Sequence, residues 1–124
     1  MGTLASMSAT QAPAVSAIAF QLSAALENYQ MQIDALADPR SQQHQYDLVG
    51  RGLDQVRMLK GALPQLSVHM VEVVICHAEL MKGLWLAGVQ SQAFAEQSLG
   101  SLRSKHRDAV AAMRERCLRV FSRQ

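Results

Sequence analysis

The sequence predicts an all-α protein, an antiparallel four-helix bundle, and three observations support this fold class. Apolar residues recur at steps of three and four over most of the 124-residue chain, which is the spacing of helices with one buried face. No stretch shows the apolar–polar alternation, bounded by turn residues, that is typical of strands. Short connections between periodic segments favour neighbouring helices that run antiparallel. We place the four helices near residues 13–38, 45–61, 65–90 and 98–122.

The first helix is expected to begin at Pro13, because proline lacks an N–H and the first turn of a helix does not need one. Residues 1–12 are small and polar without periodicity, so we expect a disordered segment there and a single bundle domain over residues 13–124. Asp38 should end the helix, since the residue before Pro39 is pushed out of helical geometry. The apolar face is formed by Val15, Ile18, Leu22, Tyr29, Ile33 and Leu36.

The second helix carries two internal glycines, Gly50 and Gly52. Each costs about 1 kcal/mol relative to alanine inside a helix. They either permit close contact with another helix or make this the weakest of the four, and the sequence leaves both interpretations open. Gly61 and Pro64 are expected to close the helix. Its apolar face is formed by Tyr46, Val49, Leu53, Val56 and Leu59.

The third helix contains the most apolar stretch of the chain, residues 68–89. A helix that is apolar nearly all round must be surrounded by its own chain or by a partner chain. Each other helix offers one apolar stripe, so we expect part of this helix to stay uncovered. One line along it is formed by Val68, Val71, Ile75 and Ala78. The candidate partner-binding residues are Met81, Leu84 and Trp85.

Trp85 separates two interpretations of this stretch. If it belongs to the core, Trp85→Ala should cost about 2–5 kcal/mol of stability, as should Leu84→Ala. If it lies at an interface, its replacement should spare the monomer and weaken association.

The fourth helix has the clearest apolar period, formed by Leu99, Leu102, His106, Val110, Met113 and Cys117. No proline separates it from the third helix. The two therefore either break within residues 88–101 or form one rod of about 55 residues. We favour a break, because typical globular helices run about 8–20 residues.

Positive charge is concentrated in this last helix, although the net charge of the whole chain is only +2. The basic residues are Arg103, Lys105, Arg107, Arg114, Arg116, Arg119 and Arg123. A regulatory protein that binds nucleic acid through this helix is therefore an alternative function. Against it, the cations occupy two flanks of the helix and no aromatic residues are interleaved for stacking on bases. Cations near a helix C-terminus are also favoured by the helix dipole.

No local signature of catalysis or cofactor binding is present in the sequence. There is no glycine-rich phosphate loop and no nucleophile elbow, so we expect neither an enzyme nor a cofactor. His69, Glu72, Cys76 and Glu79 share one helix face at a spacing that zinc sites use, but no second group of ligands accompanies them. We therefore expect no metal site, and a bundle that senses a small ligand or metal is a further alternative.

Composition favours a protein that works with a partner. Charged residues make up 18% of the chain, against about 25% in typical soluble domains. Two cysteines and a start without an export signal favour a reduced, cytoplasmic protein. Glu72, Glu79 and Lys82 interrupt the most apolar stretch, so no membrane-spanning helix is expected.

Residues 25–63, ALENYQMQIDALADPRSQQHQYDLVGRGLDQVRMLKGAL, resemble in layout the small all-α chaperones of type III and flagellar secretion systems. The shared layout is a helix, a short polar turn near a proline and a tyrosine, and a second helix interrupted by glycine. The resemblance implies a cytosolic chaperone that shields an amphipathic segment of an export substrate by helix-in-groove packing. We therefore interpret the chain as a non-enzymatic helical interaction module. It is a chaperone or adaptor that binds an amphipathic helical partner, or a protein that associates with itself as a homodimer.

Overall fold

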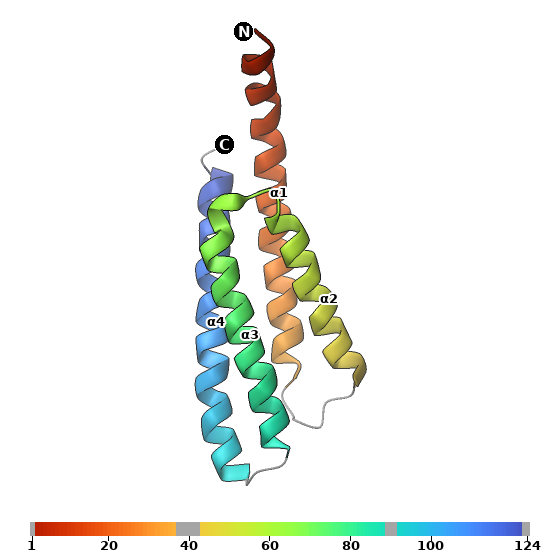
Figure 1. Ribbon diagram of the computed structural model, residues 1–124, viewed down its shortest axis with the longest axis vertical. Coiled ribbons are helices and arrows are strands. Elements are labelled where there is room, and N and C mark those ends of the chain that lie inside the picture. The colour runs from red at the N-terminus through yellow and green to blue at the C-terminus, as the bar shows by residue number, and fades with distance from the viewer. Residues whose placement is uncertain (1, 37–42, 89–91, 123–124) are drawn as a thin grey trace.

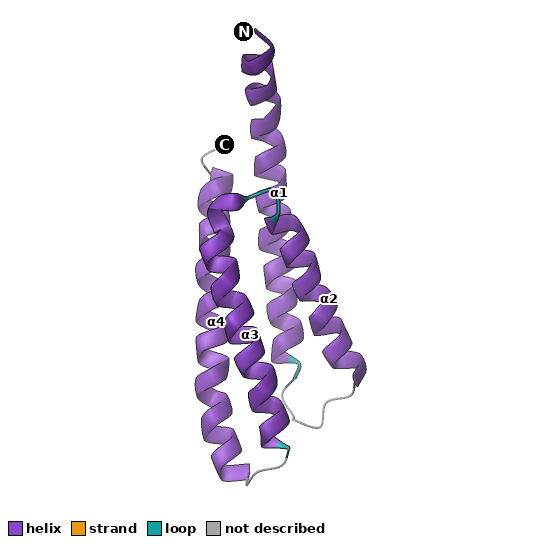
Figure 2. Ribbon diagram, viewed as in Figure 1, coloured by secondary structure: helices purple, strands orange, loops and turns teal. Residues whose placement is uncertain are grey.

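The computed structural model is an all-α, antiparallel four-helix bundle, which confirms the predicted fold class (Figure 1). It describes residues 2–36, 43–88 and 92–122. The elements are α1 (Gly2–Asp34), α2 (Gln43–Lys60), a short 3-10 helix η1 (Pro64–Leu66), α3 (Ser67–Ala87) and α4 (Gln92–Ser122). Figure 2 shows that the described part of the chain is helical apart from short turns, without strands.

α1 begins earlier than the sequence pattern predicts. Its backbone is helical from Gly2, so the start expected at Pro13 is corrected. Residues 3–12 contain no glycine or proline, and several of them are good helix formers. Apolar periodicity predicts a packed helix face, and its absence does not exclude a helical backbone. In Figure 1 this first part of α1 extends beyond the ends of the other helices.

α1 also ends earlier than predicted, at Asp34 instead of Asp38. The N–H of Leu36 donates to the carbonyl of Ile33 at 3.0 Å, which tightens the last turn. The carbonyl of Leu36 in turn accepts a hydrogen bond from the guanidinium of Arg103 on α4. A tertiary contact therefore satisfies a backbone group near this helix end.

α3 and α4 are separate helices, which confirms the break favoured from the sequence. α3 ends at Ala87, and the N–H of Gly88 donates to the carbonyl of Trp85 at 3.1 Å. α4 begins at Gln92, earlier than the predicted start near residue 98.

The four helices do not contact one another equally. α3 packs most extensively on α4, and both α4 and α2 pack on α1, whereas α2 and α3 make few contacts. In Figure 1, α2 and α3 approach each other near η1 and diverge toward the start of α2. α3 therefore has one extensive helical neighbour, and one of its sides is left without cover.

The core is apolar and draws on every helix. Its largest fully buried side chains are Leu22, Leu26, Tyr29, Ile33, Leu36, Val49, Leu63, Leu66, Leu80, Leu84, His106 and Met113. Two glycines bring helices close together. A Cβ on Gly83 of α3 would overlap Leu102 of α4, and one on Gly52 of α2 would overlap Gln32 of α1. Gly52 thus permits close contact between helices, whereas Gly50 faces open space.

Candidate functional site

α3 carries large apolar side chains on its surface as well as in the core. The exposed fraction is 79% for Val68, 58% for Val71, 47% for Ile75 and 69% for Trp85. Together with the exposed Ala78 and Lys82 they form one line along the helix. We name this line the α3 stripe, which consists of Val68, Val71, Ile75, Ala78, Lys82 and Trp85. Its successive steps of three and four residues are those of the a and d positions of a coiled coil.

The α3 stripe lies on the side of the helix away from the core. The buried face of α3 contains Val73, Leu80 and Leu84. At about 100° per residue, the stripe points roughly opposite to this face. From Val68 to Trp85 it runs for about 25 Å along the helix axis. An apolar line at the spacing of helix pairing has the geometry of a surface that contacts another helix.

Of the three predicted partner-binding residues, Trp85 alone lies fully on the surface. Leu84 is 1% exposed and belongs to the core, so its prediction as a partner contact is corrected. Consecutive helix residues point about 100° apart, which is why these two neighbours have different surroundings. Met81 is partly buried and packs against the core. The prediction omitted Val71 and Ile75 as candidates. The signal that identifies them is their regular spacing of three and four residues along one line, which the sequence alone shows.

The two edges of the α3 stripe differ in chemistry. Glu72 and Glu79 are exposed along one edge. Val74 and Met81 lie along the other edge, where both are half-buried against the core. Lys82 is the one cation within the stripe itself. Apart from Lys82, the surface is therefore apolar along its length, acidic on one side and continuous with the core on the other.

The basic side chains of α4 mostly contact groups of this same chain. The ion pairs are Lys105–Glu79 (3.8 Å), Arg107–Asp34 (3.2 Å), Arg114–Glu27 (3.1 Å) and Arg119–Glu115 (2.8 Å). Arg103 donates to a backbone carbonyl of α1, Arg116 lines a cleft, and Arg123 lies outside the described residues. Exposed pairs of this kind contribute about 0–1 kcal/mol each. Over the described residues, most of this positive charge is thus balanced locally.

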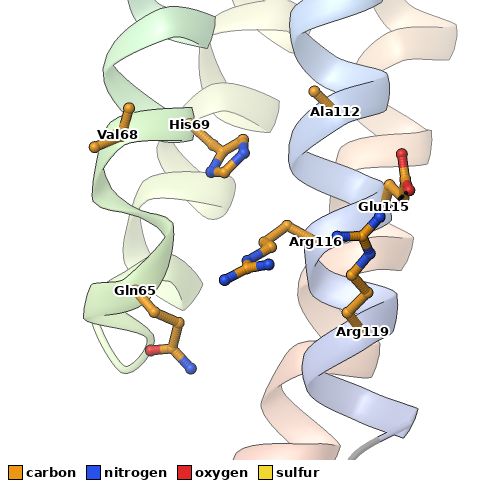
Figure 3. A pocket seen from close by; sticks show the side chains of 7 residues that line it. All are labelled: Gln65, Val68, His69, Ala112, Glu115, Arg116 and Arg119. Carbon is orange, nitrogen blue, oxygen red and sulfur yellow. Dashed lines mark hydrogen bonds and ion pairs between the residues drawn. The ribbon is translucent and has the colours of Figure 1, made fainter.

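A cleft of about 330 Å³ separates the start of α3 from the last part of α4 (Figure 3). Arg116 extends from α4 into this space, opposite Gln65 of η1 and His69 of α3. Arg119 and Glu115 line it as well and pair with each other. Because cations and a carboxylate share this open cleft, its chemistry selects no single class of ligand.

A buried hydrogen-bonded network joins three helices. The hydroxyl of Tyr29 on α1 lies 2.7 Å from Nδ1 of His77 on α3 and 2.8 Å from Nε2 of His106 on α4. Both histidine rings also pack near the Tyr29 ring. A phenol has one proton, so its oxygen donates to one histidine and accepts from the other. The three side chains therefore tie α1, α3 and α4 together within the core.

Burial keeps this network neutral near neutral pH. Burial, with a smaller contribution from the neighbouring His77, lowers the pKa of His106 from 6.5 to about 4. Burial also lowers the pKa of His77, with a further contribution from Arg57, and raises the pKa of Tyr29. Nδ1 of His106 has no hydrogen-bond partner among the described residues. We assign the network to the fold, because His106 and the Tyr29 hydroxyl lie inside the bundle.

Neither cysteine is activated. Burial and the neighbouring Glu72 raise the pKa of Cys76, and burial raises the pKa of Cys117 to about 11. Both thiols are therefore protonated near neutral pH and react poorly as nucleophiles. Where the structure describes side chains, it brings together no group of three or more His, Cys, Asp or Glu residues that could hold a metal ion.

Comparisons of the chain with protein-family models, with curated proteins and with solved structures found no match. Among the described helices, none combines the length and the apolar character needed to cross a membrane. The candidate functional site is therefore the α3 stripe, whose residues combine a mainly apolar chemistry with a regular geometry.

Proposed function

We propose that this protein is a non-enzymatic helical interaction module that binds an amphipathic helix along the α3 stripe. The observation that carries the proposal is the heptad spacing of large apolar side chains that point away from the core. Val71, Ile75 and Trp85 are each about half exposed or more. Single exposed apolar residues are common on proteins, whereas a continuous line at the spacing of helix pairing is typical of an interface.

A covering helix would be stabilised chiefly by burial of these side chains. Complete burial of one large apolar side chain is worth about 1.5–3 kcal/mol, part of which offsets the entropy lost on association. Tryptophan is enriched among the residues that contribute most to binding, so Trp85 is the expected anchor. The mode of binding is a helix laid along an apolar helical surface.

Two forms of this function differ in the source of the covering helix. In a chaperone or adaptor it belongs to a client protein, which is the role that the resemblance of residues 25–63 implies. In a self-associating protein it belongs to a second copy of the chain. Binding of nucleic acid through α4 has less support, because most of its described cations already pair with carboxylates of the bundle.

Site-specific photo-crosslinking in the native cell tests the proposal. A photoreactive amino acid at Val71 or Trp85 should form crosslinks to a protein, which mass spectrometry then identifies. Met58 provides the matched control, because it is a 70% exposed apolar residue on α2, away from the stripe. Crosslinks that are no more frequent at Val71 and Trp85 than at Met58 would falsify the proposed function.

A further inference from the structure

We infer that the α3 stripe takes an amphipathic helix of another protein, one end of which is acidic and lies over the cleft between α3 and α4. This inference rests on the proposed function of the stripe and names the chemistry of its partner. Two observations carry it. The stripe and the cleft share Val68, and the side chain of Arg116 extends into the cleft without an ion pair to any described residue.

The α3 stripe and the cleft form one continuous surface. Val68 is the first residue of the stripe, and it also lines the cleft together with His69, the next residue of α3. The opposite wall of the cleft belongs to the last part of α4 (Figure 3). By itself the cleft selects no class of ligand. A helix laid along the stripe from Trp85 to Val68, however, reaches the cleft with its next turn.

Arg116 gives this end of the surface a positive charge that the bundle does not balance. Its side chain is partly buried and extends into the cleft. The other two charged residues of the lining, Arg119 and Glu115, pair with each other at 2.8 Å. A guanidinium binds a carboxylate through two parallel hydrogen bonds, and partial burial strengthens such a pair. Arg116 is therefore complementary to a carboxylate that the partner supplies.

The start of α3 adds to the positive potential of the cleft. α3 begins at this end of the stripe, and no side chain caps its first turn with a hydrogen bond. The first turn of a helix carries a partial positive charge, which favours a nearby anion. The helix dipole and Arg116 thus act in the same direction at the same place.

An acidic neighbour restricts where the carboxylate of the partner lies. Glu72 is exposed one turn beyond Val68, about 6 Å further along the helix axis. A partner carboxylate at that level would face a like charge, which disfavours an interface. Lys82, near the other end of the stripe, is exposed, and ion pairs at exposed sites contribute little. The acidic group of the partner is therefore expected at the end that lies over the cleft.

These contacts define the partner by its chemistry. Val68 and Trp85 are about 25 Å apart along the axis, which corresponds to about five turns of a covering helix. The partner helix carries apolar residues at steps of three and four over this length. One or two aspartates or glutamates follow at the end that meets Arg116.

Photo-crosslinking in the native cell locates the two ends of the partner helix. A photoreactive amino acid at Trp85 marks the far end of the stripe, and one at Ala112, an exposed residue of the cleft wall, marks the acidic end. Both should crosslink to one helix of the same protein, at sites about 17 residues apart. The Ala112 site should lie within one turn of an aspartate or glutamate. Crosslinks from Ala112 to a segment without acidic residues, or to a second copy of this chain, would overturn the inference.

Charge exchange tests the contact with Arg116. A labelled synthetic peptide of the crosslinked segment is titrated against the purified full chain by fluorescence anisotropy. Arg116→Glu should weaken binding by about tenfold or more, whereas Arg116→Lys should weaken it less. A peptide with lysines in place of its terminal acidic residues should bind Arg116→Glu better than it binds wild type. Equal affinity of wild type and Arg116→Glu for the original peptide would contradict the inference.

The matched control for this experiment is Arg51→Glu. It reverses the charge of an exposed arginine on α2, away from the stripe and the cleft, and should leave binding of the peptide unchanged. Circular dichroism of each variant verifies that the fold is kept.

The outcomes separate this inference from the proposed function. Crosslinks from Trp85 to another protein that persist at the same yield in Arg116→Glu would overturn the acidic end and leave the interaction module intact. Crosslinks from Val71 and Trp85 no more frequent than those from Met58 would overturn both.

Discussion

α3 presents apolar side chains on two opposite faces. The inner face holds Val73, Leu80 and Leu84 in the core, whereas the outer face holds Val71 and Ile75 at the surface. The inner face meets α4 and α1, and it carries a polar anchor, the hydrogen bond of His77 to Tyr29. The outer face follows a strict heptad line, and its large apolar side chains are about half exposed or more. The buried residues of the inner face, Met70, Val73, Cys76, Leu80 and Leu84, also recur at steps of three and four, so spacing does not distinguish the two faces. Apolar character alone therefore does not identify the core of this bundle.

The largest expected difference between the two faces is a difference in stability. Leu84→Ala should lower the free energy of unfolding by about 2–5 kcal/mol, because it leaves a cavity in the core. Trp85→Ala, one residue further along α3, should change it by about 0.5 kcal/mol or less under dilute, monomeric conditions. Urea unfolding followed by circular dichroism measures both. Equal losses in the two variants would show that the faces are not distinct.

The inner face should also make stability depend on pH, whereas the α3 stripe contains no histidine. The pKa of His106 is about 4 in the folded state and about 6.5 when unfolded, so the unfolded chain binds a proton more readily. The stability that neutral His106 contributes to the fold is fully present above pH 6.5 and is lost as the pH falls toward 4. At about 1.4 kcal/mol per pKa unit, the loss is on the order of 3 kcal/mol. The lowered pKa of His77 acts in the same direction.

Urea unfolding between pH 7 and pH 4.5 measures this dependence. Carboxylates also titrate as the pH falls, so wild type is compared with His106→Gln. In this variant most of the decrease in the free energy of unfolding between pH 6.5 and pH 5 should be absent. If the free energy of unfolding falls no more steeply with pH in the wild type than in the variant, the assignment to His106 is contradicted.

Tyr29→Phe should isolate the polar anchor of the inner face. The change keeps the ring but leaves a nitrogen of His77 and one of His106 without their shared partner. Unsatisfied buried groups of this kind cost about 1–3 kcal/mol each. Thermal unfolding should therefore show a clear loss, while photo-crosslinking at Trp85 should be the same as in wild type. A variant that crosslinks less but unfolds normally would instead place this network in the interface.

The smallest expected effects come from two glycines with different surroundings. Gly83→Ala should destabilise by about 1 kcal/mol or more, because the new methyl group overlaps Leu102 on α4. Gly50→Ala should stabilise by up to about 1 kcal/mol, because it gains helix propensity and meets no other atom. Opposite signs in urea unfolding would confirm that two helices pack closely at Gly83 of α3 and not at Gly50 of α2. Stabilisation by both substitutions would show that α3 and α4 are not in close contact at Gly83.

The fold class was determined by the sequence, since helical periodicity is a local property that neighbouring residues carry. The break between α3 and α4 was only favoured, from the usual length of helices, and its position came from the structure. The line through Val68, Val71 and Ile75 is visible in the same way, because its members are three and four residues apart. Helix ends were less predictable. α1 stops at Asp34, where Arg103, far along the chain, donates to the backbone just beyond the helix.

Only the tertiary structure decided which face of α3 became core. Leu84 and Trp85 are adjacent and both apolar, and nothing local distinguishes them. The difference arises because α3 has one extensive neighbour, α4, and few contacts with α2. In the same way, the hydroxyl of Tyr29 meets two histidines that lie 48 and 77 residues away. A periodic pattern specifies that a helix has an apolar face, whereas burial of that face depends on where every other helix lies.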